Sequence, residues 1–130
     1  MFLRSLVLGL ATSLLLVTNV AAASQPPSDA HPIVVVTNTS HVCQRFDAVG
    51  LEHTPKRDKP VPPYLKREAP PGATMVFERL AGARTMVSAN PHETKDCTSK
   101  LTGHSYRYSS RGPRVKLTFD GTTFHVMERI

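Results

Sequence analysis

Tryptophan is absent from this 130-residue sequence, cysteine occurs only twice, and aromatic residues make up 6% of the chain. The sequence also offers little room for long helices, because 11 prolines interrupt it. The absences therefore argue against a long-helix protein, while the composition remains that of a folded chain and not of a disordered one. With two cysteines, the chain can form no more than one internal disulfide.

Long apolar runs are missing everywhere except at the N-terminus. Arg4 precedes an apolar run over residues 6–17, and Ala21, Ala22 and Ala23 offer a small-residue cleavage site. The run is shorter than the ~20 residues that a membrane-spanning helix needs. We expect a secretory signal peptide over residues 1–23, a flexible leader over residues 24–31, and one domain over residues 32–130.

The two cysteines, Cys43 and Cys97, both lie in the predicted mature chain. Secretion passes through oxidising compartments, so we expect a bond between them. Closing such a long loop removes entropy from the unfolded chain and stabilises the fold by about 4 kcal/mol. Two free thiols are the alternative.

Positive charge predominates, with a formal net charge of +6. One of these charges, Arg4, lies in the predicted signal peptide, which leaves +5 on the mature chain. This balance favours contact with anionic surfaces, but it does not choose between cell wall, lipid headgroups, nucleic acid and an acidic protein.

Strand patterns dominate the first half of the predicted domain. A β-branched run over residues 33–37 is typical of a central strand, and a weaker strand is expected over residues 42–49. Residues 54–73 hold six of the prolines, interleaved with lysines and arginines. Because proline lacks an N–H, we expect an exposed, mobile, basic loop over residues 54–73.

Two hairpins are expected in the second half. Residues 74–80 and 84–88 flank a turn at residues 81–83, and residues 114–119 and 122–127 flank Asp120-Gly121, a pair favoured in type I′ turns. A two-residue turn would set Leu117 opposite Phe124. With a short strand containing Tyr106 and Tyr108, the pattern predicts an antiparallel β-sandwich of six to seven strands closed by one disulfide.

No motif for metal binding or catalysis is present. The sequence lacks H-E-x-x-H, C-x-x-C and G-x-S-x-G, and the histidines are scattered, so we expect no metal, no cofactor and no enzymatic activity. The histidines are His31, His41, His53, His92, His104 and His125. The alternative is a small secreted ribonuclease, whose acid, base and arginine would come from Glu78, His104, Arg107 and His125.

Three other features are candidate sites. Asn38-Thr39-Ser40 is a glycosylation sequon, which is usable if its loop is exposed. The dibasic pairs Lys56-Arg57 and Lys66-Arg67 are candidate processing sites, and a merely solvated basic loop is the alternative. The basic C-terminal region is a candidate binding surface, since arginine and tyrosine are common interface hot spots. Its residues are Tyr106, Arg107, Tyr108, Arg111, Arg114 and Lys116.

The C-terminal third also resembles a known family. Asp96-Cys97, residues 110–113 (Ser-Arg-Gly-Pro) and residues 115–120 (Val-Lys-Leu-Thr-Phe-Asp) are similar in order and spacing to secreted effectors of plant-pathogenic fungi of the ToxA-like group, which includes secreted-in-xylem proteins of wilt fungi. The Arg-Gly-Asp loop of the founding toxin is absent. A second family of fungal effectors, the MAX group, fits the strand pattern nearly as well, although its cysteines are usually closer together.

The resemblance implies a secreted virulence protein without enzymatic activity. Such a protein binds a host protein, either in the apoplast or after entry into host cells, and a host immune receptor can recognise it. We expect no nucleic-acid partner. A secreted inhibitor or binding module without a virulence role would fit the same residues.

Overall fold

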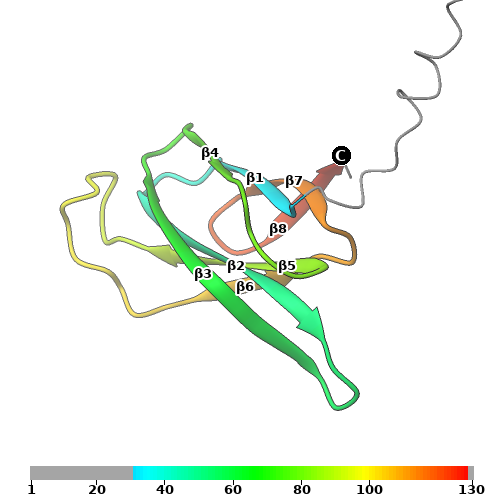
Figure 1. The fold of residues 1–130 in the computed structure, drawn as a ribbon. Helices are drawn as coiled ribbons and strands as arrows, with labels where there is room; N and C mark the ends of the chain where they lie inside the picture. Colours follow the sequence, from blue (N-terminus) through cyan, green and yellow to red (C-terminus); the bar gives the residue numbers. More distant parts are fainter. Residues whose placement is uncertain (1–30, 129–130) are drawn as a thin grey trace, which may run out of the picture. The chain divides into compact units, whose positions relative to one another are not determined.

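The computed structural model describes residues 31–128, which form two four-stranded β-sheets (Figure 1). The predicted signal peptide and all but the last residue of the predicted leader lie outside the described residues. Over residues 31–128 the chain contains eight strands and no helix, so none of it could cross a membrane as a helix. The predicted all-β sandwich is confirmed, with one strand more than the upper end of the expected count.

The first sheet has the order β4-β1-β7-β8. Its strands are β4 (Thr74–Phe77), β1 (Ile33–Asn38), β7 (Arg114–Phe119) and β8 (Phe124–Glu128). As expected from its β-branched run, β1 is central, and its buried and half-buried residues alternate. It pairs parallel to β7, while the other pairs in this sheet are antiparallel, so the sandwich is not wholly antiparallel.

The second sheet has the order β3-β2-β5-β6 and is antiparallel throughout. Its strands are β3 (Asp58–Ala69), β2 (Gln44–His53), β5 (Arg84–Pro91) and β6 (Tyr106–Ser109). The C-terminal end of β2 and the N-terminal end of β3 extend beyond β5 as a two-stranded arm (Figure 1).

Side chains from the facing sides of both sheets fill the core. Val34, Val36 and Leu117 of the first sheet are buried together with Phe46 and Val87 of the second. The rings of Phe46 and Phe119 meet edge to face, with centroids 6.3 Å apart and planes at 89°. Burying each of these side chains contributes roughly 1.5–3 kcal/mol.

The prediction of a mobile loop over residues 54–73 is wrong for most of that segment. Residues 58–69 form β3, which pairs with β2 from Asp58 to Ala69 except for two residues at an irregularity. β3 is an edge strand, where proline is tolerated because only one side of the strand donates to a ladder. Pro62 and Pro63 lie in an irregularity opposite the Val49–Gly50 step, so neither has a pairing partner in β2.

The expected hairpin over residues 74–88 is also wrong. β4 pairs with β1 in the first sheet, whereas β5 pairs with β2 and β6 in the second. The intervening residues cross from one sheet to the other, and Phe77 and Leu80 are fully buried along the way. Burial of these two side chains in the shared core favours the crossover over a tight turn.

The C-terminal hairpin is confirmed, but its register is shifted. The loop spans residues 120–123, and Leu117 pairs with Val126 instead of Phe124. Asp120 stabilises this longer loop, because its Oδ1 accepts hydrogen bonds from the backbone N–H groups of Thr122 and Thr123, each at 2.9 Å. Over residues 117–119 the shift is two residues, which keeps these side chains on their predicted faces, and an irregularity before Leu117 sets Lys116 opposite Glu128.

The bond between Cys43 and Cys97 is present, with the two Cα atoms 5.2 Å apart. It joins the start of β2 to the loop that follows β5. The expected single disulfide is therefore confirmed.

Candidate functional site

The outer face of the second sheet carries the exposed Tyr64 ring beside less exposed apolar side chains and unpaired positive charge. Strand register places Tyr64, Val49 and Met86 in one row across β3, β2 and β5. The next row along the strands is polar. It consists of Lys66, Asp47, Ser88 and Arg107. We call these two rows, together with Pro60, the outer-sheet surface.

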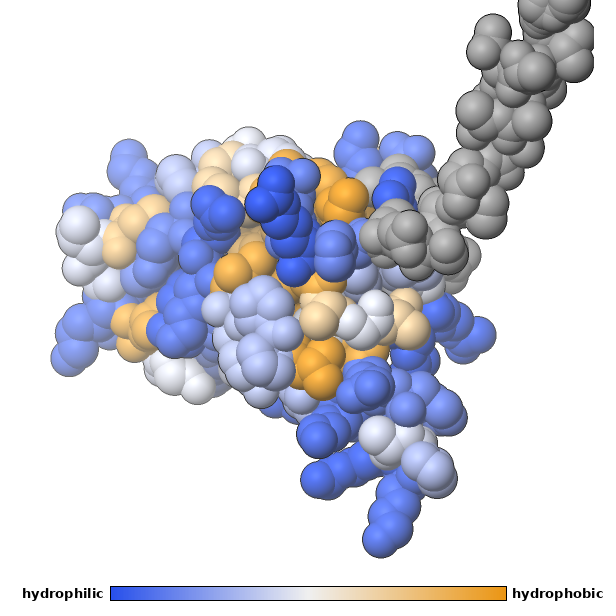
Figure 2. Space-filling view, viewed as in Figure 1, coloured by the Kyte–Doolittle hydropathy of each residue, from blue (hydrophilic) through white to orange (hydrophobic). Residues whose placement is uncertain are grey.

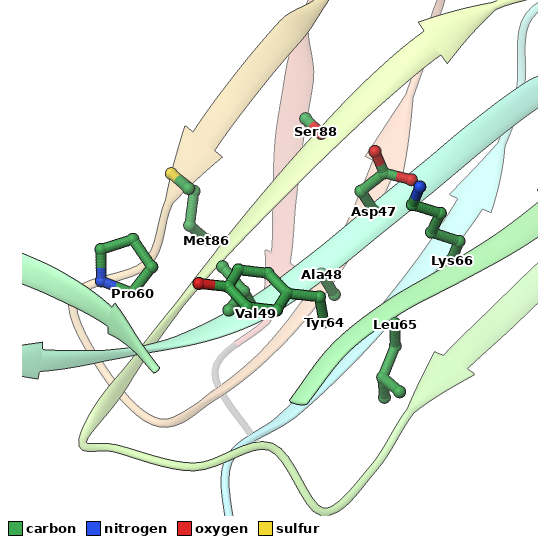
Figure 3. Close-up of a pocket in the computed structure, with 9 residues that line it drawn as sticks. All are labelled: Asp47, Ala48, Val49, Pro60, Tyr64, Leu65, Lys66, Met86 and Ser88. Carbon is green, nitrogen blue, oxygen red and sulfur yellow. The ribbon is translucent and has the colours of Figure 1, made fainter. Parts of the chain in front are cut away.

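A shallow hollow of about 160 Å³ lies in this surface (Figure 3). Its walls include Val49, Pro60, Tyr64 and Met86, with Asp47, Lys66 and Ser88 along one side. The Tyr64 side chain is 63% exposed. In Figure 3 its ring extends across the sheet toward the side of Pro60 and Met86. The hollow is therefore an apolar site of side-chain size with one polar border.

Hydrogen bonds neutralise the one carboxylate of the outer-sheet surface. Arg45 donates to both oxygens of Asp47, at 3.2 and 3.1 Å, and Asn90 donates to the Arg45 carbonyl at 3.0 Å. Lys66 and Arg107 make no ion pair with any residue in 31–128. The surface consequently presents unpaired positive charge next to the apolar hollow.

The predicted C-terminal binding surface is divided by the fold. Tyr106 and Tyr108 pair with Ala89 and Val87 and face the core, where their rings lie 5.5 Å from Phe119 and 6.1 Å from Phe124. Of the three candidate residues on this strand, only Arg107 faces outward.

The remaining basic residues of that prediction lie elsewhere. Lys116 occupies the outer face of the first sheet, where it forms an ion pair with Glu128 at 3.6 Å. Arg114 starts the same strand, and Arg111 lies in the exposed loop before it. The six residues therefore do not form one patch.

The two dibasic pairs differ in accessibility. Lys56-Arg57 lies at the exposed turn of the β2–β3 arm, which Figure 2 shows as a hydrophilic projection. Lys66-Arg67 lies within β3 and is paired with Asp47 and Phe46. Only the first pair is in the exposed, irregular backbone that a processing protease requires.

The Asn38 sequon is not available in the folded chain. Asn38 is fully buried, and its Nδ2 donates to the carbonyls of Val42 and Ala69, both at 2.8 Å. Its Oδ1 accepts from the backbone N–H and the hydroxyl of Ser40. A glycan on Nδ2 is incompatible with this packing, so the candidate glycosylation site is corrected to a structural asparagine.

The residues of the ribonuclease alternative do not converge. Glu78 follows β4 and His125 lies on β8, and these strands form opposite edges of the first sheet. No hydrogen bond or ion pair within residues 31–128 joins any two of Glu78, His104, Arg107 and His125. His125 instead contacts Asp120 at 2.8 Å. This contact and the backbone N–H groups of Thr122 and Thr123 lower the pKa of Asp120.

No family model, curated protein or solved structure matches this chain. The resemblance to ToxA-like effectors therefore stays a prediction.

Sequence reasoning missed Tyr64, Val49 and Met86 as a group. Tyr64 fell in the supposed loop, and the other two lie on strands far apart in the sequence. The sequence contains a partial signal, because Asp47, Val49 and Leu51 occupy every second position of β2. Only the register of three strands brings Tyr64 and Met86 beside Val49.

Proposed function

We propose that this chain is a secreted binding protein without enzymatic activity, and that it binds an acidic segment of a partner protein on the outer-sheet surface. The observation that carries the proposal is the exposed Tyr64 ring beside an apolar hollow, with Lys66 and Arg107 free of carboxylate partners within residues 31–128. Tyrosine and arginine dominate interface hot spots because they combine apolar area with directed hydrogen-bond donors. A partner with an apolar side chain flanked by carboxylates fits this arrangement.

The resemblance to ToxA-like effectors supports a role in infection. On that proposal the partner is a host protein, and a host immune receptor is a second protein that recognises the chain. A secreted inhibitor without a virulence role would use the same surface, and the identity of the bound protein distinguishes the two.

The charge on the β2–β3 arm and along the rest of β3 supports an acidic partner. Residues 51–67 hold five lysines and arginines against Glu52 and Asp58, and Asp58 is already paired with Arg84. A positive field of this kind accelerates encounter with an acidic protein and weakens as salt is added.

The test compares three single variants for capture of partners from host tissue. Tyr64→Ser and Lys66→Glu change the proposed surface, whereas Lys95→Glu makes the same charge reversal in the exposed loop after β5. Captured proteins are identified by mass spectrometry, and the affinity of each purified partner is then measured by calorimetry. We expect both surface variants to weaken binding at least about tenfold, which corresponds to ~1.4 kcal/mol.

Two results would overturn the proposal. One is equal capture of every partner by the wild type and by both surface variants. The other is loss of capture after nuclease treatment, which would assign the surface to nucleic acid. Matching thermal midpoints among the variants establish that Tyr64→Ser, at an exposed position, has not unfolded the chain.

A further inference from the structure

The disulfide lies in a cluster of side chains that could bind a metal. The Cys43 Sγ lies 3.7 Å from Glu68 Oε1, and His92 Nε2 lies 2.6 Å from the same oxygen. The potential ligand atoms of Cys43, Glu68 and His92 are all within 4.8 Å of one another. Cys97 adds a second sulfur, bonded to the first. Three potential ligands, from the residue before β2, from β3 and from the residue after β5, therefore meet at one place, with the Cys97 sulfur attached to one of them.

His92 is already oriented as a metal ligand. It is 5% exposed, and its Nδ1 lies 2.7 Å from the Ser99 carbonyl. A carbonyl only accepts, so Nδ1 carries the proton of this hydrogen bond and Nε2 is the nitrogen directed at Glu68. A histidine that binds a metal through one nitrogen commonly donates the other N–H to a backbone carbonyl, which fixes the ring.

Backbone hydrogen bonds tie Cys43 to the start of the loop that carries Cys97, independently of the disulfide. The Cys43 N–H donates to the Thr94 carbonyl at 3.0 Å, and the His92 N–H donates to the Cys43 carbonyl at 2.8 Å. On the Cys97 side, Asp96 Oδ1 accepts from the Thr98 N–H at 2.9 Å. These hydrogen bonds hold the loop of Cys97 beside Cys43 without the help of the covalent bond.

We propose that reduction of the Cys43–Cys97 disulfide creates a zinc site formed by the two thiolates, His92 Nε2 and the Glu68 carboxylate. In the oxidised chain the sulfurs carry no thiolate charge, so two of the four ligands are missing. Zinc prefers four ligands of this kind in a tetrahedron, with bonds of about 2.0–2.3 Å. The Glu68 side chain, 46% exposed, gives the ion access from solvent.

A phosphine supplies the two electrons for this reduction. The phosphine takes the oxygen of one water molecule and becomes a phosphine oxide, its two electrons break the S–S bond, and the two protons of the water end on the sulfurs. Binding of Zn²⁺ then releases both protons, because the thiolate is the ligand, and it also displaces the proton that His92 Nε2 and Glu68 share. A covalent link in an oxidising compartment is replaced by a metal link in a reducing one, and the loop after β5 stays fastened to β2 in both.

The experiment uses Co²⁺ as a spectroscopic substitute for zinc. The purified protein is titrated with Co²⁺ in its oxidised form and after reduction with a phosphine. We expect the visible bands of tetrahedral Co²⁺ and a sulfur-to-cobalt charge-transfer band only in the reduced form, and loss of both when Zn²⁺ is added. Zn²⁺ should also raise the thermal midpoint of the reduced protein and leave that of the oxidised protein unchanged.

Variants distinguish the four-ligand site from metal binding by the two thiolates alone. Glu68→Gln and His92→Gln should each weaken Co²⁺ binding at least about tenfold, the double variant Cys43→Ser/Cys97→Ser should abolish it, and His104→Gln, at an exposed histidine, should leave it unchanged. If His92→Gln does not fold, the Co²⁺ affinity of Glu68→Gln, at a half-exposed position, tests the site. Absence of the bands in the reduced wild type, or equal affinity of the wild type and Glu68→Gln, would overturn the proposal.

Discussion

Gly50 lies so close to the Ala81 carbonyl that a β-carbon on it would be 1.5 Å from the oxygen. This contact packs the crossover between β4 and β5 against β2. In the same place the Ala83 N–H donates to the Leu51 carbonyl at 2.9 Å. The two sheets are thus joined by backbone packed on backbone, which only glycine permits at this position.

Gly50→Ala should destabilise the fold by about 3 kcal/mol or more, because a backbone neighbour cannot rotate away from the added methyl group. Gly112→Ala is the matched control. A β-carbon there meets nothing within 4 Å, and we expect a change within about 0.5 kcal/mol. Urea unfolding of the three proteins measures the difference, and equal midpoints would contradict the observed crossover.

Acid should weaken the C-terminal hairpin through Asp120. Its pKa is lowered in the folded chain, mainly by the hydrogen bond with His125 and then by the N–H groups of Thr122 and Thr123. A lowered pKa stabilises the folded chain above the ordinary carboxyl pKa of about 4, and this contribution is lost as the pH falls below it.

Asp120→Asn should therefore lose less stability between pH 5 and pH 2 than the wild type does, as measured by urea unfolding at each pH. Glu93→Gln, at an exposed carboxylate without an ion pair within residues 31–128, should follow the wild-type curve. An NMR titration in which the Asp120 carboxyl group titrates near pH 4 would refute the assignment.

Limited trypsin digestion should cut first after Lys56 or Arg57. These residues lie at the exposed turn of the β2–β3 arm, whereas Lys66 and Arg67 are held in β3 by pairing with β2. The fragments should stay together until the disulfide is reduced, because the cut falls between Cys43 and Cys97. Mass spectrometry with and without reductant measures both parts, and first cuts after Lys66 or Arg67 would argue against β3 as a strand.

Asn38→Asp should destabilise the fold by about 3 kcal/mol or more. The change replaces the Nδ2 donor with an oxygen that faces the Val42 and Ala69 carbonyls in a fully buried site. Thr74→Ser, at an exposed side chain, is a suitable control and should cost little. In a eukaryotic secretory host, the wild-type protein should carry no glycan on Asn38, and a glycan mass on folded, secreted protein would contradict the burial of this side chain.

Several elements could be predicted from the sequence because their causes are local. The β-branched run that became β1 and the turn chemistry at Asp120 specify strands and a hairpin without reference to distant residues. The bond between Cys43 and Cys97 followed because no other partner was available in an oxidising compartment.

The tertiary structure alone decided which strands pair. By local rules the prolines of β3 predict a loop, yet an edge strand needs donors on one side only, and edge position depends on the whole sheet. The segments on either side of residues 78–83 were adjacent in sequence, but burial of Phe77 and Leu80 placed them in different sheets.

Both candidate sites depend on these long-range pairings. Tyr64 and Met86 become neighbours only through the β2 strand between them, and His92 meets Glu68 only because β3 and β5 flank β2. Alternation of apolar and polar residues determines which face a side chain takes, whereas its neighbours on that face are determined by strand order and register. Strand order follows from the packing of one shared core, to which every strand contributes.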